Sequence, residues 1–165
     1  MYFNSGTTTD LFGQAISGDW SIADGRYNGT AAAGAPAINS TSLIVSPSSF
    51  IDLSATLRFV GEGGFIFDQY DAENVKFVTI SAGKVTIGHR TSRGWFIDAT
   101  DNNPSITAGT DYTLGLTLKG TTVSVTLNGQ PVFSHMYNAL VTDGLFGVFS
   151  RTGTTSFDRF TAGHG

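Results

Sequence analysis

The sequence has no cysteine, and only two glutamates and three lysines occur among its 165 residues. The absence of cysteine excludes a disulfide framework and a thiolate metal site. Because Glu and Lys usually cover the exposed faces of helices, their scarcity disfavours helices, whereas Gly, Thr, Ser and Phe, which favour turns and strands, are abundant. The composition therefore predicts a single all-β domain with a polar, weakly charged surface.

Clustered positive charge is also missing. The net charge is −4, from 13 acidic and 9 basic side chains, and no run of Lys or Arg occurs. Phosphate neutralisation requires such clusters, so no nucleic-acid partner is expected. The longest apolar stretches fall far short of the ~20 residues that span a bilayer, so no membrane insertion is expected. Residues 1–6 lack the charged start and apolar centre of a signal peptide, so an export signal would lie outside this sequence or follow another route.

Residues 64–90 carry the clearest strand signal. Three apolar runs within this stretch are separated by two polar breaks; the runs are 65–67, 75–80 and 85–87. The first break covers residues 68–74, and the second, residues 81–84, is short enough for a tight reversal. The pattern predicts three consecutive antiparallel strands.

About a dozen short strands are expected in the whole chain, with turn signals every ~8–12 residues. Residues 51–60 alternate between apolar and polar, which is typical of a half-buried strand. Asn128-Gly129 is the strongest hairpin signal. Residues 31–39 have no period and are predicted as a loop, and 135–143 is the one stretch with room for a helical turn. Because one open sheet of this size would expose two long edges and an apolar face, two packed antiparallel sheets, a sandwich or jelly roll, are predicted.

Four motifs follow one another in a characteristic order. They are 64–78, the pair of runs 112–114 and 125–129, then 144–148, and finally 156–158. In this order they resemble the concanavalin A-like lectin and glucanase superfamily, in particular laminin-G-like modules of large bacterial surface and repeats-in-toxin adhesins. The resemblance covers residues 10–162 and leaves 1–9 as a linker or chain start and 163–165 as a tail.

The resemblance implies a jelly-roll sandwich whose concave sheet or loop rim often binds glycans. It also implies one module of a longer, multidomain protein that is extracellular or on the bacterial cell surface. Glycanases of this superfamily carry paired glutamates on one strand, and a retaining pair of carboxyls lies about 5–5.5 Å apart. Here Glu62 and Glu73 are 11 positions apart in different turns, and neither a Gly-x-Ser-x-Gly elbow nor a zinc-ligand spacing of histidines occurs. We therefore expect no enzyme, with hydrolysis by Asp68 and Asp71 as the remaining catalytic alternative.

Sugar binding requires an aromatic face for the apolar side of a pyranose and polar groups for its hydroxyls. The candidate glycan-binding residues are Asp68, Tyr70, Arg90, Arg93, Trp95 and Tyr137, with His89 beside them. Alternation places Asp68 and Tyr70 on one face of their strand and Arg90 on the polar side of another, which predicts a polar patch on one sheet face. Two alternatives stay open: Trp95 belongs to the core, and Arg90 only pairs with Asp68 across strands.

Calcium is the expected metal, because it takes about six to eight hard oxygen ligands. The first polar break offers such oxygens from Asp68, Gln69, Asp71 and Asn74, although the same side chains can simply solvate a turn. The resemblance implies a second, structural calcium site at Asp158. Its carbonyl ligands would come from an early turn, at Asp24-Gly25 or Asn28-Gly29, and the alternative is an Asp158 that only accepts hydrogen bonds from the backbone.

Three functions follow from these patterns. The favoured one is a non-catalytic, lectin-like carbohydrate-binding module with a glycan as its partner and calcium as the ion that could stabilise it. The second is a structural spacer or protein-interaction module of an adhesin without a small ligand. The third is a glycan-active hydrolase.

Overall fold

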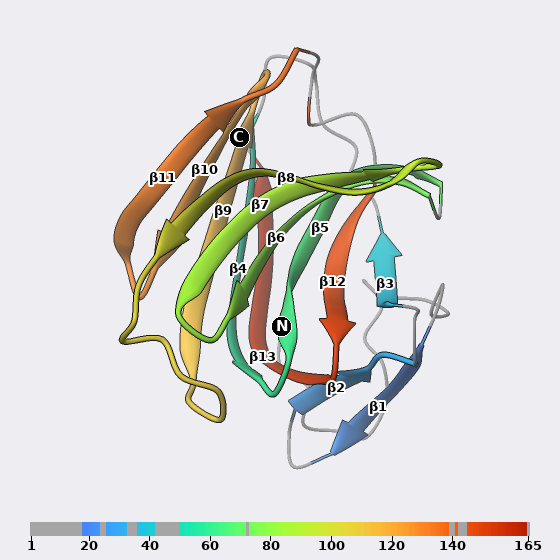
Figure 1. The fold of residues 1–165 in the computed structure, drawn as a ribbon, viewed down its shortest axis with the longest axis vertical. Coiled ribbons are helices and arrows are strands. Elements are labelled where there is room, and N and C mark those ends of the chain that lie inside the picture. The colour runs from blue at the N-terminus through green and yellow to red at the C-terminus, as the bar shows by residue number, and fades with distance from the viewer. Residues whose placement is uncertain are drawn as a thin grey trace.

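The computed structural model describes residues 18–23, 26–32, 36–41, 50–71, 73–138, 141 and 145–164. Within these ranges thirteen strands form two antiparallel sheets, which are stacked as two curved layers (Figure 1). The strands, in chain order, are β1 (Asp19–Ala23), β2 (Arg26–Thr30), β3 (Ala37–Thr41), β4 (Phe50–Phe59), β5 (Glu62–Asp71), β6 (Asn74–Ser81), β7 (Lys84–Thr91), β8 (Gly94–Asn102), β9 (Tyr112–Lys119), β10 (Thr122–Leu127), β11 (Gln130–Met136), β12 (Leu145–Thr152) and β13 (Thr154–His164). The predicted all-β, two-sheet sandwich is confirmed.

One sheet has seven strands in the order β1-β2-β13-β4-β9-β10-β11, and the other has six in the order β3-β12-β5-β6-β7-β8. The edge strands β11 and β8 therefore belong to different layers. No helix in the described part of the chain is long and apolar enough to cross a membrane.

Local sequence explains the most regular elements. In β4 the residues alternate between buried and more exposed, with Ile51, Leu53 and Leu57 each at most 1% exposed, as the period-2 pattern predicts. Asn128 and Gly129 join β10 to β11 with φ values of 52° and 81°. These are the two positive φ angles that a tight hairpin turn requires.

The main core lies between the two layers. Phe65 of β5 and Phe160 of β13 are fully buried, and their ring centroids meet edge-on at 6.0 Å across the layers. Burial of one such aromatic side chain stabilises the fold by ~1.5–3 kcal/mol. Tyr27, on β2, is buried at one end of this core, and Trp20 of β1 stacks on it with ring centroids 4.9 Å apart.

The six-stranded sheet is apolar on its other face as well. A second cluster there contains Ile38, Ile66, Val75, Phe77 and Phe149, with Trp95 packed against it. A sheet that is buried on both faces explains why β5 and β6 carry continuous apolar runs instead of alternation.

One local prediction is wrong. Residues 37–39, predicted within a loop, belong to β3, which pairs with β12 through contacts such as Val148↔Asn39. For β3, pairing with the distant strand β12 supplies hydrogen bonds that local sequence does not reveal. In the 135–143 stretch, which has room for a helical turn, β11 continues as a strand to Met136, and residues 139, 140, 142 and 143 lie outside the described residues.

Candidate ligand pocket between the two sheets

A pocket of about 540 Å³ opens where the edge strands β8 and β11 of the two layers approach each other. We call it the corner pocket. It is lined by Asp68, Tyr70, Asn74, Val75, Lys76, His89, Arg90, Thr91, Asp98, His135, Met136, Tyr137 and Asn138. Its volume is typical of a small-molecule site.

A bulge in β5 positions Asp68. The register passes from Phe67↔Lys76 to Asp71↔Asn74, so three residues of β5 lie opposite one residue of β6. Asp68 has a φ of 49°, a left-handed conformation that is uncommon outside glycine but tolerated by Asp. Strain of this kind persists where the surrounding structure enforces it, and bulges often re-aim a side chain next to a functional site.

The carboxylate of Asp68 is buried but only half satisfied. Its side chain is 1% exposed, and Oδ2 accepts a hydrogen bond from Lys76 Nζ at 2.5 Å. Oδ1 is buried and has no hydrogen-bond partner. Since an unpaired buried polar atom costs about 1–3 kcal/mol, the arrangement suits an oxygen that meets a donor from outside the chain.

A second bulge, in β8, positions Asp98. Ile87 pairs with Ala99 but Gly88 pairs with Ile97, which leaves Asp98 as the extra residue. Its Oδ2 accepts a hydrogen bond from Tyr137 Oη at 2.8 Å and lies 2.8 Å from His89 Nδ1. The two bulges thus turn two carboxylates toward the same pocket, and the Asp98–Tyr137 bond joins the two sheets there.

Tyr137 forms the inner wall of the corner pocket. Its ring packs edge-on against the buried Phe67, with centroids 6.4 Å apart, and Lys76 Nζ lies 5.1 Å from its ring centre. Burial raises the pKa of Tyr137 well above its ordinary value, and its hydrogen bond to Asp98 and the negative charges of Asp98 and Asp68 raise it further. The hydroxyl therefore remains a proton donor to Asp98 throughout the neutral range.

The rim of the pocket is more open. Tyr70 is 61% exposed and Met136 is 71% exposed, and Arg90, Asn74 and other polar side chains lie among them. An exposed aromatic ring beside several hydrogen-bonding groups is the combination that binds the apolar face and the hydroxyls of a sugar.

Four of the six predicted glycan-binding residues line this pocket, namely Asp68, Tyr70, Arg90 and Tyr137. The alternative in which Arg90 only pairs with Asp68 across neighbouring strands is not found, because β6 lies between β5 and β7 and Lys76 is the partner of Asp68. Asp68, Tyr70 and Arg90, the three residues of the predicted polar patch, do line one pocket, although the β5 bulge interrupts the alternation on which the patch was based.

Trp95 and Arg93 are not among the lining residues. The ring of Trp95 packs edge-on against Phe77, in the apolar cluster on the outer face of the six-stranded sheet. The guanidinium groups of Arg90 and Arg151 lie 4.9 and 4.7 Å from its ring centre. Arg93 is exposed in the turn between β7 and β8, where its backbone N–H donates to Thr91 Oγ1. Arg90 therefore links the pocket rim to this second aromatic group.

The first group of predicted calcium ligands lies at the end of β5 and at the start of β6. Asp71 is exposed and caps its own turn, accepting hydrogen bonds from Asn74 Nδ2 and the backbone N–H of Glu73. These bonds, first the one from the Asn74 side chain, lower the pKa of Asp71. Gln69 is buried with its side-chain amide unpaired.

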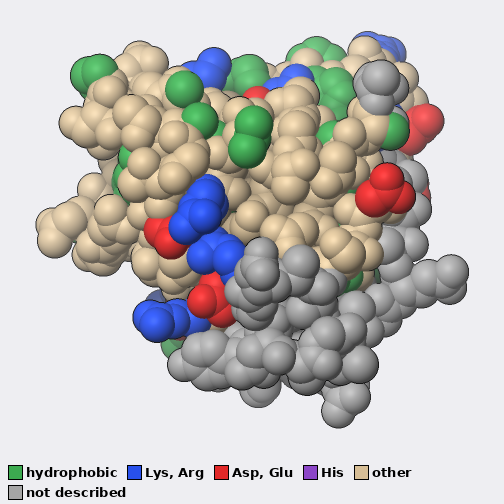
Figure 2. Space-filling model, turned by 90° about the horizontal axis from the view of Figure 1, so that it is seen from below, with side chains coloured by type: hydrophobic (Ala, Val, Ile, Leu, Met, Phe, Trp, Pro, Cys, Tyr) green, Lys and Arg blue, Asp and Glu red, His purple; other side chains and the backbone are tan. Residues whose placement is uncertain are grey.

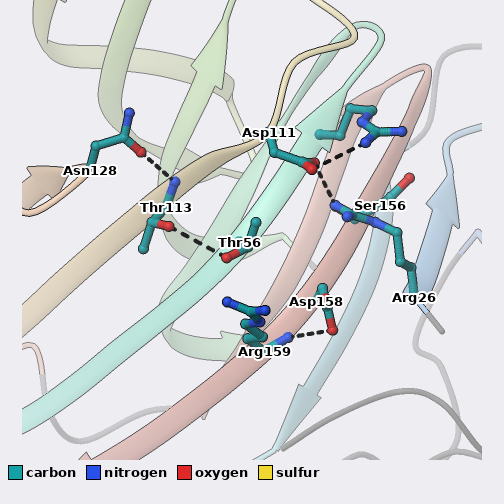
Figure 3. Close-up of polar contacts among 9 residues, drawn as sticks. Arg26, Thr56, Asp111, Thr113, Asn128, Ser156, Asp158 and Arg159 are labelled. Atoms are coloured by element: carbon teal, nitrogen blue, oxygen red, sulfur yellow. Dashed lines mark hydrogen bonds and ion pairs between the residues drawn. The ribbon is translucent and has the colours of Figure 1, made fainter.

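Asp158 and Asn28, two residues of the predicted structural calcium site, lie on the paired strands β13 and β2. Asp158 Oδ1 accepts a hydrogen bond from the backbone N–H of Arg159 at 2.8 Å (Figure 3). Asn28 lies opposite Ser156 in the register and donates from Nδ2 to the carbonyl of Arg26. Asp24 lies outside the described residues. In the described part of the chain no three His, Asp or Glu side chains are grouped so that they would hold a metal, so a calcium ion at Asp158 would take most of its oxygen ligands from backbone carbonyls.

The outer surface of the seven-stranded sheet is polar. Asp111 pairs with Arg26 at 3.0 Å and with Arg58 at 3.1 Å, and Figure 3 shows the Asp111 carboxylate facing the side chain of Arg26. Figure 2 shows the molecule from below, where hydrophobic side chains are scattered and positive and negative side chains lie next to one another. Charges that neutralise each other in this way match the weakly charged surface that the composition predicts.

Sequence reasoning missed Lys76 and Asp98 as parts of the site. Lys76 stands within an apolar run and Asp98 directly follows one, so neither belongs to a polar motif. The one available signal was a charged side chain next to residues that must be buried, which usually means a paired charge.

No family model matches the sequence, and no curated protein matches it significantly. Solved structures do match it in shape. The carbohydrate-binding module CBM66 from Bacillus subtilis superposes with a TM-score of 0.77 and 17% identity, over 90% of this chain and 93% of that one. A protein of unknown function with a galectin-like fold from Bacillus subtilis gives 0.69 and 13% identity, over 98% and 94% of the two chains. The β-glucanase of Bacillus licheniformis gives 0.62 and 10% identity, over 98% and 96%. At these identities the likeness is one of fold, and the chain has the galectin-like, concanavalin A-like β-sandwich.

Proposed function

We propose that this protein is a non-catalytic carbohydrate-binding module that takes a glycan into the corner pocket. The observation that carries the proposal is the pocket itself, in which exposed Tyr70 stands beside hydrogen-bonding side chains from both sheets. The similarity in shape to a carbohydrate-binding module over nine-tenths of the chain supports it.

The pocket is better suited to binding than to bond cleavage. A glycosidase needs one carboxyl that donates a proton to the leaving group and a second one nearby. Here the ammonium group of Lys76 forms an ion pair with the Asp68 carboxylate, and the Asp98 carboxylate contacts Tyr137 and His89. Glu62 lies elsewhere, where it accepts a hydrogen bond from Thr79 and is 3.7 Å from Arg151. These contacts fix side chains in place for recognition of hydroxyl groups.

The test is binding to a glycan array, followed by titration calorimetry with the strongest ligand. We expect Tyr70→Ala and Arg90→Ala each to weaken binding about tenfold or more, because each removes a contact worth ~1.5 kcal/mol or more. Arg93→Ala and Ile97→Ala are the matched controls, since both side chains are exposed and lie outside the pocket. A blank array, with and without Ca²⁺, would instead favour a spacer or protein-interaction module.

The wider setting is proposed from the family resemblance. We propose that the domain, residues 10–162, is one module of a larger secreted or surface-anchored bacterial protein of the adhesin type. Calcium remains a separate proposal, at Asp158 with carbonyls from the Asp24 turn. Thermal melting in Ca²⁺ and in chelator tests this proposal, because a bound ion raises the melting temperature by mass action. Equal melting temperatures would contradict the proposed calcium site.

A further inference from the structure

Asp68 Oδ1 is the buried atom of the corner pocket that lacks a hydrogen-bond donor. Oδ1 is buried in a side chain that is 1% exposed, while Oδ2 is engaged by Lys76. A carboxylate oxygen accepts hydrogen bonds and cannot donate them. A ligand that satisfies Oδ1 must therefore present a hydroxyl or another N–H or O–H group.

Neighbouring groups extend this acceptor site. His89 Nδ1 faces the Asp98 carboxylate at 2.8 Å, an arrangement that places the proton on Nδ1 and leaves Nε2 as an acceptor in the neutral ring. The ring is held by stacking on Phe96, with centroids 5.1 Å apart. Lys76 has three N–H bonds, one of which is directed to Asp68. The pocket wall thus offers two acceptor atoms, Asp68 Oδ1 and His89 Nε2, and one donor group, the ammonium of Lys76.

The charges of the pocket disfavour an anionic ligand. Its lining contains two cations, Lys76 and Arg90, and two anions, Asp68 and Asp98, and Lys76 is already paired with Asp68. A carboxylate or sulfate at the inner wall would lie in contact with the free oxygen of Asp68. Two negative charges in contact repel each other strongly where bulk water is excluded. A neutral group with adjacent hydroxyls meets no such barrier.

We infer that the corner pocket selects a neutral sugar unit through two neighbouring hydroxyls, one donating to Asp68 Oδ1 and the other accepting from Lys76 Nζ. The inference rests on the proposed function and names the class of sugar and the residue that selects it. Asp68 is the specificity-determining residue, and Tyr70 and Arg90 supply contacts at the rim.

The test compares two sets of oligosaccharides by calorimetry on the full chain: neutral gluco-, galacto-, manno- and fructo-oligosaccharides, and oligosaccharides of the corresponding uronic acids. Two variants change the acceptor without straining the backbone, because Gly and Asn both tolerate a positive φ. Asp68→Gly removes both carboxylate oxygens, and Asp68→Asn removes the charge and replaces one oxygen with an NH2 donor. Glu73→Gln is the control, since Glu73 is an exposed acid near the same β5–β6 turn and does not line the pocket.

We expect neutral oligosaccharides to bind and uronic acid oligosaccharides to bind at least tenfold more weakly. Asp68→Gly should lower the affinity for the neutral ligand about tenfold or more, as expected for loss of a charged hydrogen bond, while Glu73→Gln leaves it unchanged. Preferred binding of uronates, or unchanged binding by folded Asp68→Gly while Tyr70→Ala abolishes it, would overturn the inference and leave glycan binding intact. If no oligosaccharide binds, the proposed function itself fails.

Discussion

At the scale of single residues, the corner pocket is defined by polar groups that the fold buries with particular partners. Asp98 is held by two hydrogen bonds and Asp68 by one ion pair. Such partners fix the rotamers of the side chains before a ligand arrives, and pre-organisation of this kind reduces the entropy lost on binding.

Because of Tyr137, the free energy of unfolding is expected to depend on pH in the alkaline range. Because burial and the nearby carboxylates raise its pKa in the folded protein, the folded state holds this proton more tightly than the unfolded chain. The resulting stability is fully present below about pH 10, the ordinary value of tyrosine, and is lost as the pH rises above it. We expect the free energy of unfolding in urea to fall between about pH 10 and 11.5, and less steeply in Tyr137→Phe.

A residual slope is expected in that variant, because burial also raises the pKa of Tyr27. Equal slopes in the wild type and Tyr137→Phe would contradict the assignment. Tyr112→Phe is a matched control, since Tyr112 lies outside the pocket and its hydroxyl donates to the backbone carbonyl of Ser105 instead of to a carboxylate.

At the scale of strands and turns, bulges shape the site and glycines permit close approach. The β5 and β8 bulges aim Asp68 and Asp98, and Gly88 lies beside the β8 bulge. A Cβ atom on Gly88 would lie 2.3 Å from the carbonyl oxygen of Phe96 and 2.6 Å from a ring carbon of Phe77. The close pairing of β7 with β8 therefore depends on the absence of a side chain there.

We expect Gly88→Ala to cost ~1–3 kcal/mol of stability through overpacking. It should also weaken glycan binding, because a shift of β8 displaces Asp98 from Tyr137. Urea unfolding and calorimetry measure the two effects. Full affinity in a destabilised Gly88→Ala protein would show that the β8 bulge does not control the pocket.

Gly129→Ala is expected to behave differently. Gly129 has a φ of 81°, and a Cβ atom added there would have no neighbouring atom within 4 Å, so the substitution adds only backbone strain, ~1–2 kcal/mol. The urea midpoint should fall while glycan affinity stays unchanged. Gln130→Ala, at the exposed neighbouring position, serves as a control with little effect on either quantity.

At the scale of the whole molecule, the site exists because two sheets meet at their edges. Tyr137, just beyond β11, reaches Asp98 on β8, and the aromatic core behind it holds the layers in register. Phe65 and Phe160 form one of the contacts across the layers. Loss of packing between the sheets should therefore affect stability and the pocket together.

Phe65→Ala tests this dependence. Truncation of a fully buried Phe costs ~3–5 kcal/mol, because a cavity replaces the lost contacts, and urea unfolding should show a loss in this range. Val60→Ala, at a position that is 71% exposed, is the control and should change stability little. A loss below ~1 kcal/mol for Phe65→Ala would argue against a packed interface between the layers.

The sequence alone determined the elements whose signal is local. Alternation in 51–60 predicted β4, Asn128-Gly129 predicted the β10–β11 hairpin, and the apolar runs in 64–90 predicted β5 to β7. Period and turn chemistry are properties of a few consecutive residues, so they are legible in the chain, and the two-layer sandwich follows from the number of strands.

Only the tertiary structure decided which polar residues meet. β3 was missed because its hydrogen bonds come from β12, about a hundred positions away. Two bulges turn Asp68 and Asp98 toward the pocket, the strand order brings Lys76 and not Arg90 to Asp68, and Trp95 packs in the second apolar cluster. A bulge shifts the register of a strand by one or two residues. Whether a bulge is favoured depends on packing against both faces of the sheet, and this packing exists only once the layers are assembled.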